Sequence, residues 1–395
     1  MSHRIYFDHA ATTPISPSVL SEVSRQMAVI GNPSSLHYEG RVVRESVESA
    51  RERIARSIGC QPNEVIFTAS GTEANNAAIK GLFWHRSPRK VIVSTGIEHH
   101  AALDPIHWLV EHEGAIHRKV AVDAQGALDL DSLDRIVKQE GEAIALITLI
   151  HTNNELGTAI DDAEMARIRE IVGQIPLHLD AVQALGKVPF HFARSGAFSA
   201  TISAHKVGGP LGVAALILKN GVDITPLLHG GGQEREIRSG TLNAPGIVGF
   251  AAAVEEVTTE LTSRREKVAA LRDAMVNEIF ALVPDGTING RGDAPGIINV
   301  TFPGTVNEAS LLLFDSHGIS CSTGSACSQG LAQPSHVLLA LGLRQVDVDA
   351  SLRFSLSHTN TVAEVARFAE VLPEVIRGAR GAFNATLPSV SRAQF

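Results

Sequence analysis

Short apolar runs alternate with amphipathic, helix-length segments along most of this chain. The runs are rich in Val, Ile, Leu and Ala with little polar interruption, which is typical of strands buried on both faces of a sheet. They lie at residues 65–68, 91–93, 143–150, 177–180, 200–203 and 213–218. Helical segments lie between them at 73–85, 101–113 and 165–172. The alternation predicts an α/β fold with a mainly parallel sheet covered by helices on both sides.

The length of 395 residues exceeds what one hydrophobic core usually supports, about 250–300 residues. A long helical stretch at 245–282 separates the alternating part from a second pattern. That pattern has strands at 297–302 and 352–356 and helices at 308–317, 335–341 and 362–371. We therefore expect a large domain at 15–255 and a smaller α+β domain formed by 1–14 together with 256–395.

The charge balance and the cysteine content limit the possible partners and compartments. The chain has 34 Lys and Arg against 42 Asp and Glu, a formal net charge of −8, and no basic run. Nucleic-acid-binding proteins normally carry a concentrated basic face, so we expect no direct nucleic-acid partner. The N-terminus lacks a secretory pattern, the apolar stretches are too short to cross a bilayer, and three cysteines form no disulfide framework. We expect no membrane association and a location in the reducing cytoplasm, where a cysteine can act as a thiol.

Lys206 follows a predicted strand in the segment Ser-Ala-His-Lys-Val-Gly-Gly-Pro at 203–210. A lysine at a sheet edge is suited to forming a Schiff base if its surroundings lower its pKa. Taken alone, a solvated lysine in a turn is the commoner explanation. Ser203 and Lys206 also match the S-x-x-K pattern of penicillin-recognising enzymes, but their S-D-N and K-T-G motifs are absent, which excludes that class.

Two further segments stand where strands are expected to end. Thr72, in Ser-Gly-Thr-Glu at 70–73, is a candidate N-cap, and the free N–H groups of a first helical turn can bind an anion. Ordinary capping explains this segment equally well. Asp180 ends the strand at 177–180, at the edge where α/β sheets bind ligands. A buried acid needs a hydrogen-bonding or charged partner, although a structural role remains open.

The three cysteines stand in different surroundings. Cys327 lies among Ser and Gly residues at 322–330, and a thiol on such a loop is presented for reaction rather than packed. Cys321 continues the alternation of a strand and is expected in the core, and Cys60 follows a helix end. His99 and His100 stand side by side in a turn and match no metal-site spacing, so we expect no metal.

Taken together, these segments resemble the NifS/IscS-type cysteine desulfurases of the class V aminotransferase family. The resemblance covers nearly the whole chain, and its motifs keep the family's order and spacing. It includes Tyr-Phe-Asp-His-Ala-Ala-Thr-Thr-Pro at 6–14 and the segments at 31–35, 152–157, 203–210, 322–330 and 351–356. A catalytic cysteine loop at about 321–333 resembles the family's extended-loop group and not its shorter R-x-G-x-x-C group.

The resemblance implies a fold-type I homodimer with pyridoxal 5'-phosphate at the domain and subunit interface. Lys206 would carry the cofactor as a Schiff base, and Asp180 would pair with its pyridine nitrogen. Gln183 would bond its phenolic oxygen, and His99 would stack on the ring and serve as a catalytic acid.

The resemblance also implies how phosphate and substrate are held. Thr72, Ser203 and His205 would bind the phosphate, with Thr241 reaching in from the partner subunit. Asn154 would lie beside cofactor and substrate. Arg353 would clamp the substrate carboxylate, which suits a guanidinium. Cys327 matches the residue that receives sulfur as a persulfide.

The implied activity is conversion of L-cysteine to L-alanine, with the sulfur passed to an acceptor protein for iron–sulfur cluster assembly or another thiolation. Two alternatives remain at this point. The chain could be a selenocysteine lyase or another lyase or aminotransferase of the same fold. It could also be a non-catalytic sulfur-relay or assembly subunit, although the presence of both Lys206 and Cys327 argues against that class.

Overall fold

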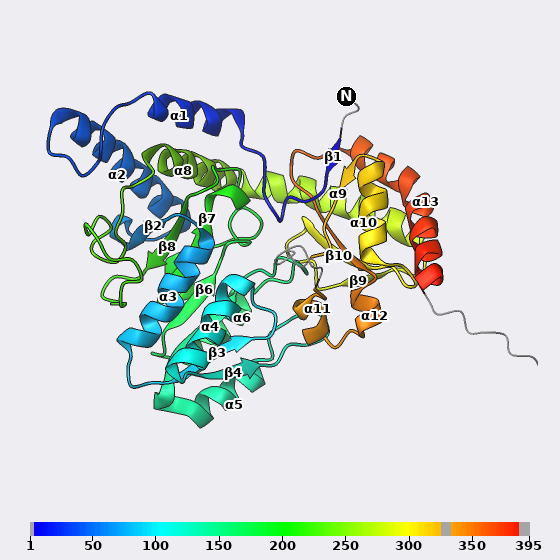
Figure 1. Cartoon of the computed structure of the whole chain (residues 1–395), viewed down its shortest axis with the longest axis horizontal. Helices are drawn as coiled ribbons and strands as arrows, with labels where there is room; N and C mark the ends of the chain where they lie inside the picture. Colours follow the sequence, from blue (N-terminus) through cyan, green and yellow to red (C-terminus); the bar gives the residue numbers. More distant parts are fainter. Residues whose placement is uncertain (1–3, 325–332, 387–395) are drawn as a thin grey trace, which may run out of the picture.

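The computed structural model describes residues 4–324 and 333–386. Its largest sheet has seven strands (Figure 1). The strand order is β2-β8-β7-β6-β5-β3-β4. Their bounds are β2 (Val65–Thr68), β3 (Val91–Thr95), β4 (Ile116–Val120), β5 (Ile144–Ile150), β6 (Leu177–Asp180), β7 (Ser199–Ser203) and β8 (Ala214–Leu218). β8 runs antiparallel to β2 and β7, and the other pairs are parallel. The predicted α/β class with a mainly parallel sheet is confirmed.

Helices cover both faces of this sheet because successive strand residues point to opposite sides. In β2, Val65 and Phe67 join the core under one set of helices, whereas Ile66 joins the core under the other. The first set is α1 (Pro17–Met27), α2 (Tyr38–Ile58), α5 (Leu130–Glu140), α6 (Asp162–Val172) and α8 (Ala244–Thr259), and the second is α3 (Gly71–His85) and α4 (His100–Glu113). Because helices cover both faces of the sheet, the strand sequences are unbroken apolar runs.

A second core lies beside the sheet, at the right in Figure 1. It contains the three-stranded antiparallel sheet β12-β10-β9 and the parallel pair β1-β11. The strands are β1 (Ile5–Tyr6), β9 (Thr287–Asn289), β10 (Ile297–Thr301), β11 (Ile319–Ser320) and β12 (Ser351–Ser355), and the helices packed on them are α9 (Leu261–Leu282), α10 (Asn307–Ser316) and α13 (Val362–Thr386). Phe7, Phe314, Phe354 and Phe368 are fully buried there. These contacts support a small domain built from both ends of the chain, and we keep the division at 14/15 and 255/256 as a proposal.

The helical stretch expected at 245–282 is divided in the structure. α8 ends at Thr259, and α9 begins at Leu261. Between them Glu260 leaves helical geometry, with φ −97° and ψ 9°. The remaining short elements are α7 (Phe192–Ser195), α11 (His336–Ala340) and α12 (Gln345–Val348). The break lets α8 pack against α1 and α2 while α9 turns away to pack against α13.

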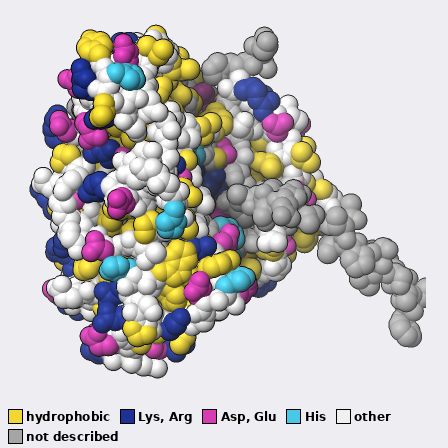
Figure 2. Space-filling view, turned by 60° about the vertical axis from the view of Figure 1, so that its left-hand side comes forward, with side chains coloured by type: hydrophobic (Ala, Val, Ile, Leu, Met, Phe, Trp, Pro, Cys, Tyr) yellow, Lys and Arg dark blue, Asp and Glu magenta, His cyan; other side chains and the backbone are white. Residues whose placement is uncertain are grey.

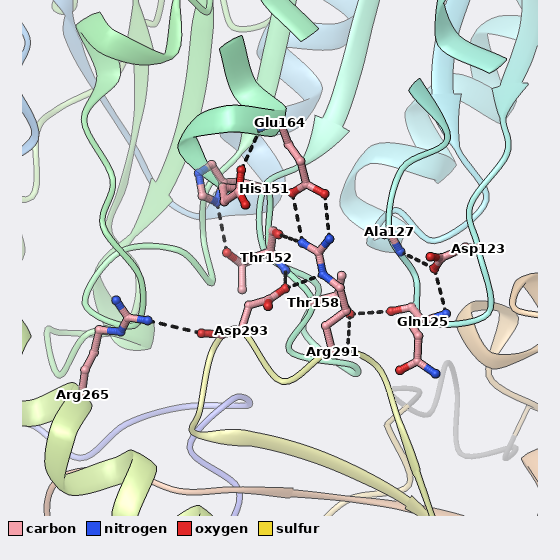
Figure 3. Close-up of polar contacts among 12 residues, drawn as sticks. Asp123, Gln125, Ala127, His151, Thr152, Thr158, Glu164, Arg265, Arg291 and Asp293 are labelled. Atoms are coloured by element: carbon pink, nitrogen blue, oxygen red, sulfur yellow. Dashed lines mark hydrogen bonds and ion pairs between the residues drawn. The ribbon is translucent and has the colours of Figure 1, made fainter. Parts of the chain in front are cut away.

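Arg291 joins the second core to the large sheet (Figure 3). Its guanidinium binds both carboxylate oxygens of Glu164 on α6, at 2.7 and 3.0 Å, and Asp293 at 2.8 Å. Its backbone N–H donates to the Thr158 hydroxyl, and Asp293 accepts from the N–H of Ala159. A bidentate Arg–carboxylate pair fixes orientation as well as distance, so these contacts set how β9 and β10 lie against α6.

The outer surface mixes charges of both signs. On the face shown in Figure 2, Lys and Arg side chains are interspersed with Asp and Glu. Across the described ranges, none of the helices combines the length and apolar character needed to cross a membrane.

Candidate active site

A cavity of about 500 Å³ opens beyond the carboxyl ends of β6 and β7, where open α/β sheets bind their ligands. Most of the residues predicted for cofactor and substrate line it, namely Thr72, His99, Asn154, Asp180, Gln183, Ser203, His205, Lys206 and Arg353. Thr241 does not line it and is exposed elsewhere on the surface. Cys327 lies outside the described residues. The fold therefore gathers nearly all of the predicted pocket, while the individual roles remain predictions.

Lys206 projects from the turn after β7 toward the N-terminal segment. Its ammonium donates to the carbonyl oxygens of Ala10 and Ala11, both at 2.8 Å. Burial and the positive charge of Arg353 lower its pKa to about 8, although Asp8 and Asp180 act in the opposite direction. A lysine with this pKa is partly neutral near physiological pH, which a Schiff-base-forming amine requires.

Asp180 is the last residue of β6, and its side chain is held from two directions. Oδ2 accepts a hydrogen bond from Asn75 Nδ2 at 2.7 Å, and Oδ1 accepts from the N–H of Val182 at 3.1 Å. Asn75 is fixed in turn by His178 Nε2 at 2.9 Å, and His178 Nδ1 lies 2.8 Å from the Ser199 hydroxyl. Because every residue in this series of hydrogen bonds is buried, the Asp180 carboxylate is oriented before any ligand binds.

His99 caps the N-terminus of α4 and is exposed to the cavity. Its Nδ1 accepts a hydrogen bond from the N–H of Ala101 at 3.0 Å, so the neutral ring carries its proton on Nε2. The surrounding protein desolvates the ring and lowers its pKa; the nearby Asp180 carboxylate opposes this, and Lys206 adds to it. A neutral imidazole whose Nδ1 is hydrogen-bonded can stack on a ring and donate or accept a proton at Nε2.

Arg353 lies in the middle of β12, almost fully buried. Its Nη2 pairs with Asp8 Oδ1 at 2.7 Å, and Nη1 donates to the carbonyl oxygen of Asn154 at 3.0 Å. Its Nε has no partner among the described residues. These bonds hold the guanidinium plane in place and leave donor capacity for a carboxylate in the cavity.

The N-terminus of α3 differs from the prediction in one respect. Ser70, not Thr72, is the N-cap, because the Ser70 hydroxyl accepts the N–H of Glu73 at 3.1 Å. Thr72 instead lies in the first turn and lines the cavity. Glu73 accepts the N–H of Ala69 and pairs with Arg238 at 2.8 Å. With the cap supplied two residues earlier, the Thr72 hydroxyl and the first-turn N–H groups are available to an anion.

Ser203, His205 and Gln183 complete this side of the cavity. Burial lowers the pKa of His205 to about 4, with further contributions from the positive charges of Lys206 and Lys187, so its ring is neutral. Gln183 donates from Nε2 to the Ala10 carbonyl at 2.7 Å, while its buried Oε1 has no partner among the described residues.

Cys321 also lines the cavity, yet it belongs to the second core as predicted. Burial raises its pKa well above the usual range, and the nearby Asp8 adds to the effect. Burial likewise raises the pKa of Cys60 to about 12. A thiol with so high a pKa is protonated and a poor nucleophile at neutral pH.

Several residues that hold this site in place were not identified from the sequence. Asn75 and His178 orient Asp180, and Asp8 holds Arg353. Glu155, buried beside the cavity, accepts from the Ser335 hydroxyl at 2.6 Å. Asp8 and Glu155 lie in the family motifs at 6–14 and 152–157, and an ionisable residue in such a motif could have indicated a role at the site. Asn75 and His178 carried none, because an amide in a helix and a histidine in a strand have no typical spacing.

The chemistry of the cavity fits pyridoxal phosphate. The cofactor needs an amine for its aldehyde, a carboxylate for its pyridine nitrogen and donors for its phosphate. Lys206, Asp180 and the first turn of α3 supply these groups around one cavity. The unpartnered Gln183 Oε1 and Arg353 Nε are buried polar atoms, and such atoms carry a free-energy cost that a bound polar ligand can remove.

Comparison with known proteins gives a consistent result. The family described as Aminotransferase class-V matches residues 5–368. An IscS-like cysteine desulfurase of Mycobacterium tuberculosis (strain ATCC 25618 / H37Rv) is 44% identical over 384 residues, which are 95% of this chain and 97% of the relative. A solved NifS-like protein has a TM-score of 0.87 and 33% identity, covering 95% of this chain and 100% of that one. SspA in complex with cysteine has a TM-score of 0.78 and 31% identity, covering 90% and 100%.

The sheet, the cavity and these neighbours define the class of protein as a fold-type I enzyme that depends on pyridoxal phosphate. More narrowly, the chain belongs to the aminotransferase class-V family.

Proposed function

We propose that this protein is a cysteine desulfurase that converts L-cysteine to L-alanine and transfers the sulfur to Cys327 as a persulfide. The observation that carries the proposal is the single cavity in which Lys206, Asp180 and Arg353 meet. The relatives support the substrate, since one of them is an IscS-like cysteine desulfurase and a similar solved structure is SspA in complex with cysteine. The balance is one cysteine and one enzyme thiol giving one alanine and one enzyme persulfide.

Pyridoxal phosphate, when bound, supplies the electron sink that makes the Cα–H bond of cysteine acidic. In the proposed reaction Arg353 binds the substrate carboxylate, and Asn154 lies beside it. Lys206 accepts the Cα proton, which its pKa of about 8 permits near neutral pH. His99 exchanges a proton at Nε2. Asp180 keeps the pyridine nitrogen protonated through a carboxylate that Asn75 already orients.

Cys327 is assigned as the sulfur acceptor from its motif, since it lies outside the described residues. Its thiolate attacks the substrate sulfur, the Cβ–S bond of the substrate breaks, and an S–S bond forms on the enzyme. Cys321 is a poor alternative because burial keeps its thiol protonated.

We further propose a homodimer that acts in the cytoplasm and delivers sulfur to an acceptor protein. Thr241 does not reach the cavity of its own chain, which supports its predicted role in the partner's site. Large apolar side chains are exposed around the α1–α2 connection, namely Met27, Ile30, Leu36 and Tyr38. An apolar surface of this kind is typical of a subunit contact. A single narrow peak at twice the chain mass in light scattering would support the dimer.

The function is tested by incubating the holoenzyme with L-cysteine and measuring alanine, sulfide and the mass of each cysteine peptide. We expect alanine, and one additional sulfur on the peptide that contains Cys327. Cys327→Ser should still change the cofactor absorbance on adding cysteine but release no sulfide, whereas Cys60→Ser should retain turnover. Additional sulfur on Cys321 would contradict the acceptor assignment. Cleavage of selenocysteine with no alanine from cysteine would instead support a selenocysteine lyase.

A further inference from the structure

A second cavity, of about 60 Å³, shares Lys206 with the active-site cavity but lies away from Asp180. It lies between the segments that follow β6 and β7, the helix α9 and the residues just after β12. Its lining is rich in nitrogen donors. They come from His9, Lys187, Arg264, Arg265 and His358, and the Thr13 hydroxyl adds another polar group. No carboxylate lines it among the residues that the structure describes.

Several donors of this lining lack protein partners. His9 is only 3% exposed, and neither ring nitrogen makes a hydrogen bond of normal geometry among the described residues, although the Asn360 side chain and the Tyr6 backbone lie close enough to raise its pKa. Arg265 Nε is likewise buried and unpartnered. Lys187 makes one long hydrogen bond, 3.4 Å to the carbonyl oxygen of Lys206, and no ion pair within the described ranges. By contrast Arg264 is paired with Glu256 and Glu260.

We infer that this cavity binds a small monovalent anion of the size of chloride, held by Lys187 and the unpartnered donors of His9 and Arg265. A cationic group out of water is costly unless a charge of opposite sign accompanies it. A cavity of 60 Å³ holds about four water-sized groups, enough for one halide ion and a few waters.

Anion binding is coupled to the charge of Lys187. Burial, together with the charges of Lys206 and Arg353, lowers the pKa of Lys187 to about 7. Burial also lowers the pKa of His9 to about 4 and lowers the pKa of His358, so both rings are protonated less readily than a free imidazole. With pyridoxal phosphate on Lys206, Lys187 is the remaining lining amine, and burial and the charge of Arg353 still lower its pKa. Anion affinity therefore falls about tenfold for each pH unit above the pKa of Lys187, the slope for one coupled proton.

The site is tested by solving crystals of the holoenzyme grown in sodium bromide, at a pH below and a pH above the Lys187 pKa. We expect an anomalous bromide peak in the cavity at the lower pH and a weaker one at the higher pH. Ordered water without an anomalous peak at both values would overturn the inference. The crystals are of the unmutated holoenzyme, and their result does not depend on whether the enzyme desulfurates cysteine.

Solution measurements extend the test. Chloride should raise the thermal midpoint of the holoenzyme more than gluconate at equal ionic strength, and this difference should shrink as pH rises. Lys187→Met should lose the bromide peak and the chloride-specific shift, whereas Lys138→Met, on the exposed face of α5, should keep both. A peak that persists unchanged in Lys187→Met would also contradict the proposed site.

Discussion

The two sides of Lys206 differ in how their charged groups are satisfied. Toward the active-site cavity, Asp180 accepts two hydrogen bonds, and Arg353 pairs with Asp8. Toward the smaller cavity, Lys187 has one long hydrogen bond, and the ring nitrogens of His9 make none of normal geometry among the described residues. The first side is oriented by the protein before a ligand binds, which is what electrostatic catalysis requires. The charged and polar groups of the smaller cavity would be satisfied only when the proposed anion binds there.

Replacing Lys206 should give the largest effect on the active-site side. Lys206→Ala removes both the amine for the cofactor and the proposed base, so alanine formation should fall by about 10⁴-fold. The visible absorbance of the cofactor–lysine adduct should disappear, as a spectrum of the purified protein would show. Lys187→Met should keep that absorbance and lose less than tenfold in turnover. Equal losses in the two variants would remove the distinction between the two sides.

Asp180→Ala should give the next largest effect, a loss of about 10²–10³-fold in turnover. A loss of this size is typical of removing one preorganised electrostatic partner. The measurement is made at saturating pyridoxal phosphate, so weaker cofactor binding does not contribute. Asp131→Ala, an exposed acid in the first turn of α5, is the control and should retain activity. Similar losses at both positions would mean that the site is misplaced.

Asn75→Ala tests whether the prior orientation of Asp180 matters. The variant loses a hydrogen bond to a charged group, worth about 1.5–3 kcal/mol, which corresponds to roughly 10- to 100-fold in turnover. Asn76→Ala, on the same helix and bonded to the Thr72 carbonyl, should lose less. The Asn75 defect should appear mainly in kcat at saturating cysteine, whereas a defect confined to cofactor affinity would argue against the orienting role.

The pH dependence of cofactor attachment should report the surroundings of Lys206. Its pKa is lowered to about 8, so the reactive neutral amine increases as pH rises through that value. The rate at which apoprotein forms the adduct with pyridoxal phosphate should rise with pH until about 8 and then level off. Arg353→Leu removes a positive charge that lowers this pKa, so its profile should move to higher pH. Arg344→Leu, at an exposed position, should leave the profile in place.

Lys187→Met should have the smallest effect on activity but a visible effect on stability. The pKa of Lys187 is lowered from 10.5 to about 7 in the folded protein, so the unfolded chain binds more protons between these values. Stability in low-halide buffer therefore contains a contribution that rises with pH across this window, by at most about 1.4 kcal/mol per unit. Urea unfolding at several pH values should show a flatter profile in Lys187→Met. Identical profiles would show that Lys187 is solvated.

The sequence was a good guide where a pattern reflects burial on both faces. The strand at 177–180 and the helix at 73–85 match β6 and α3 within two residues. β4 gave no signal, because this edge strand exposes Ile116, Arg118 and Lys119 and its polarity resembles that of a loop. The N-cap of α3 was also missed by two residues, since Ser70 and Thr72 are both good capping residues and only the backbone geometry distinguishes them.

What the sequence by itself determined is the α/β class, the family motifs, and the placement of Asp180 at the end of one predicted strand and of Lys206 just after the next. These follow from local periodicity and from the rule that parallel strands present their carboxyl ends on one edge. Only the tertiary structure decided that Asp8 meets Arg353 across 345 positions, that Asn75 holds Asp180, and that Lys187 lines a separate cavity. Contacts of this kind depend on how close-packed elements meet, and close packing is a property of the assembled core rather than of any local pattern.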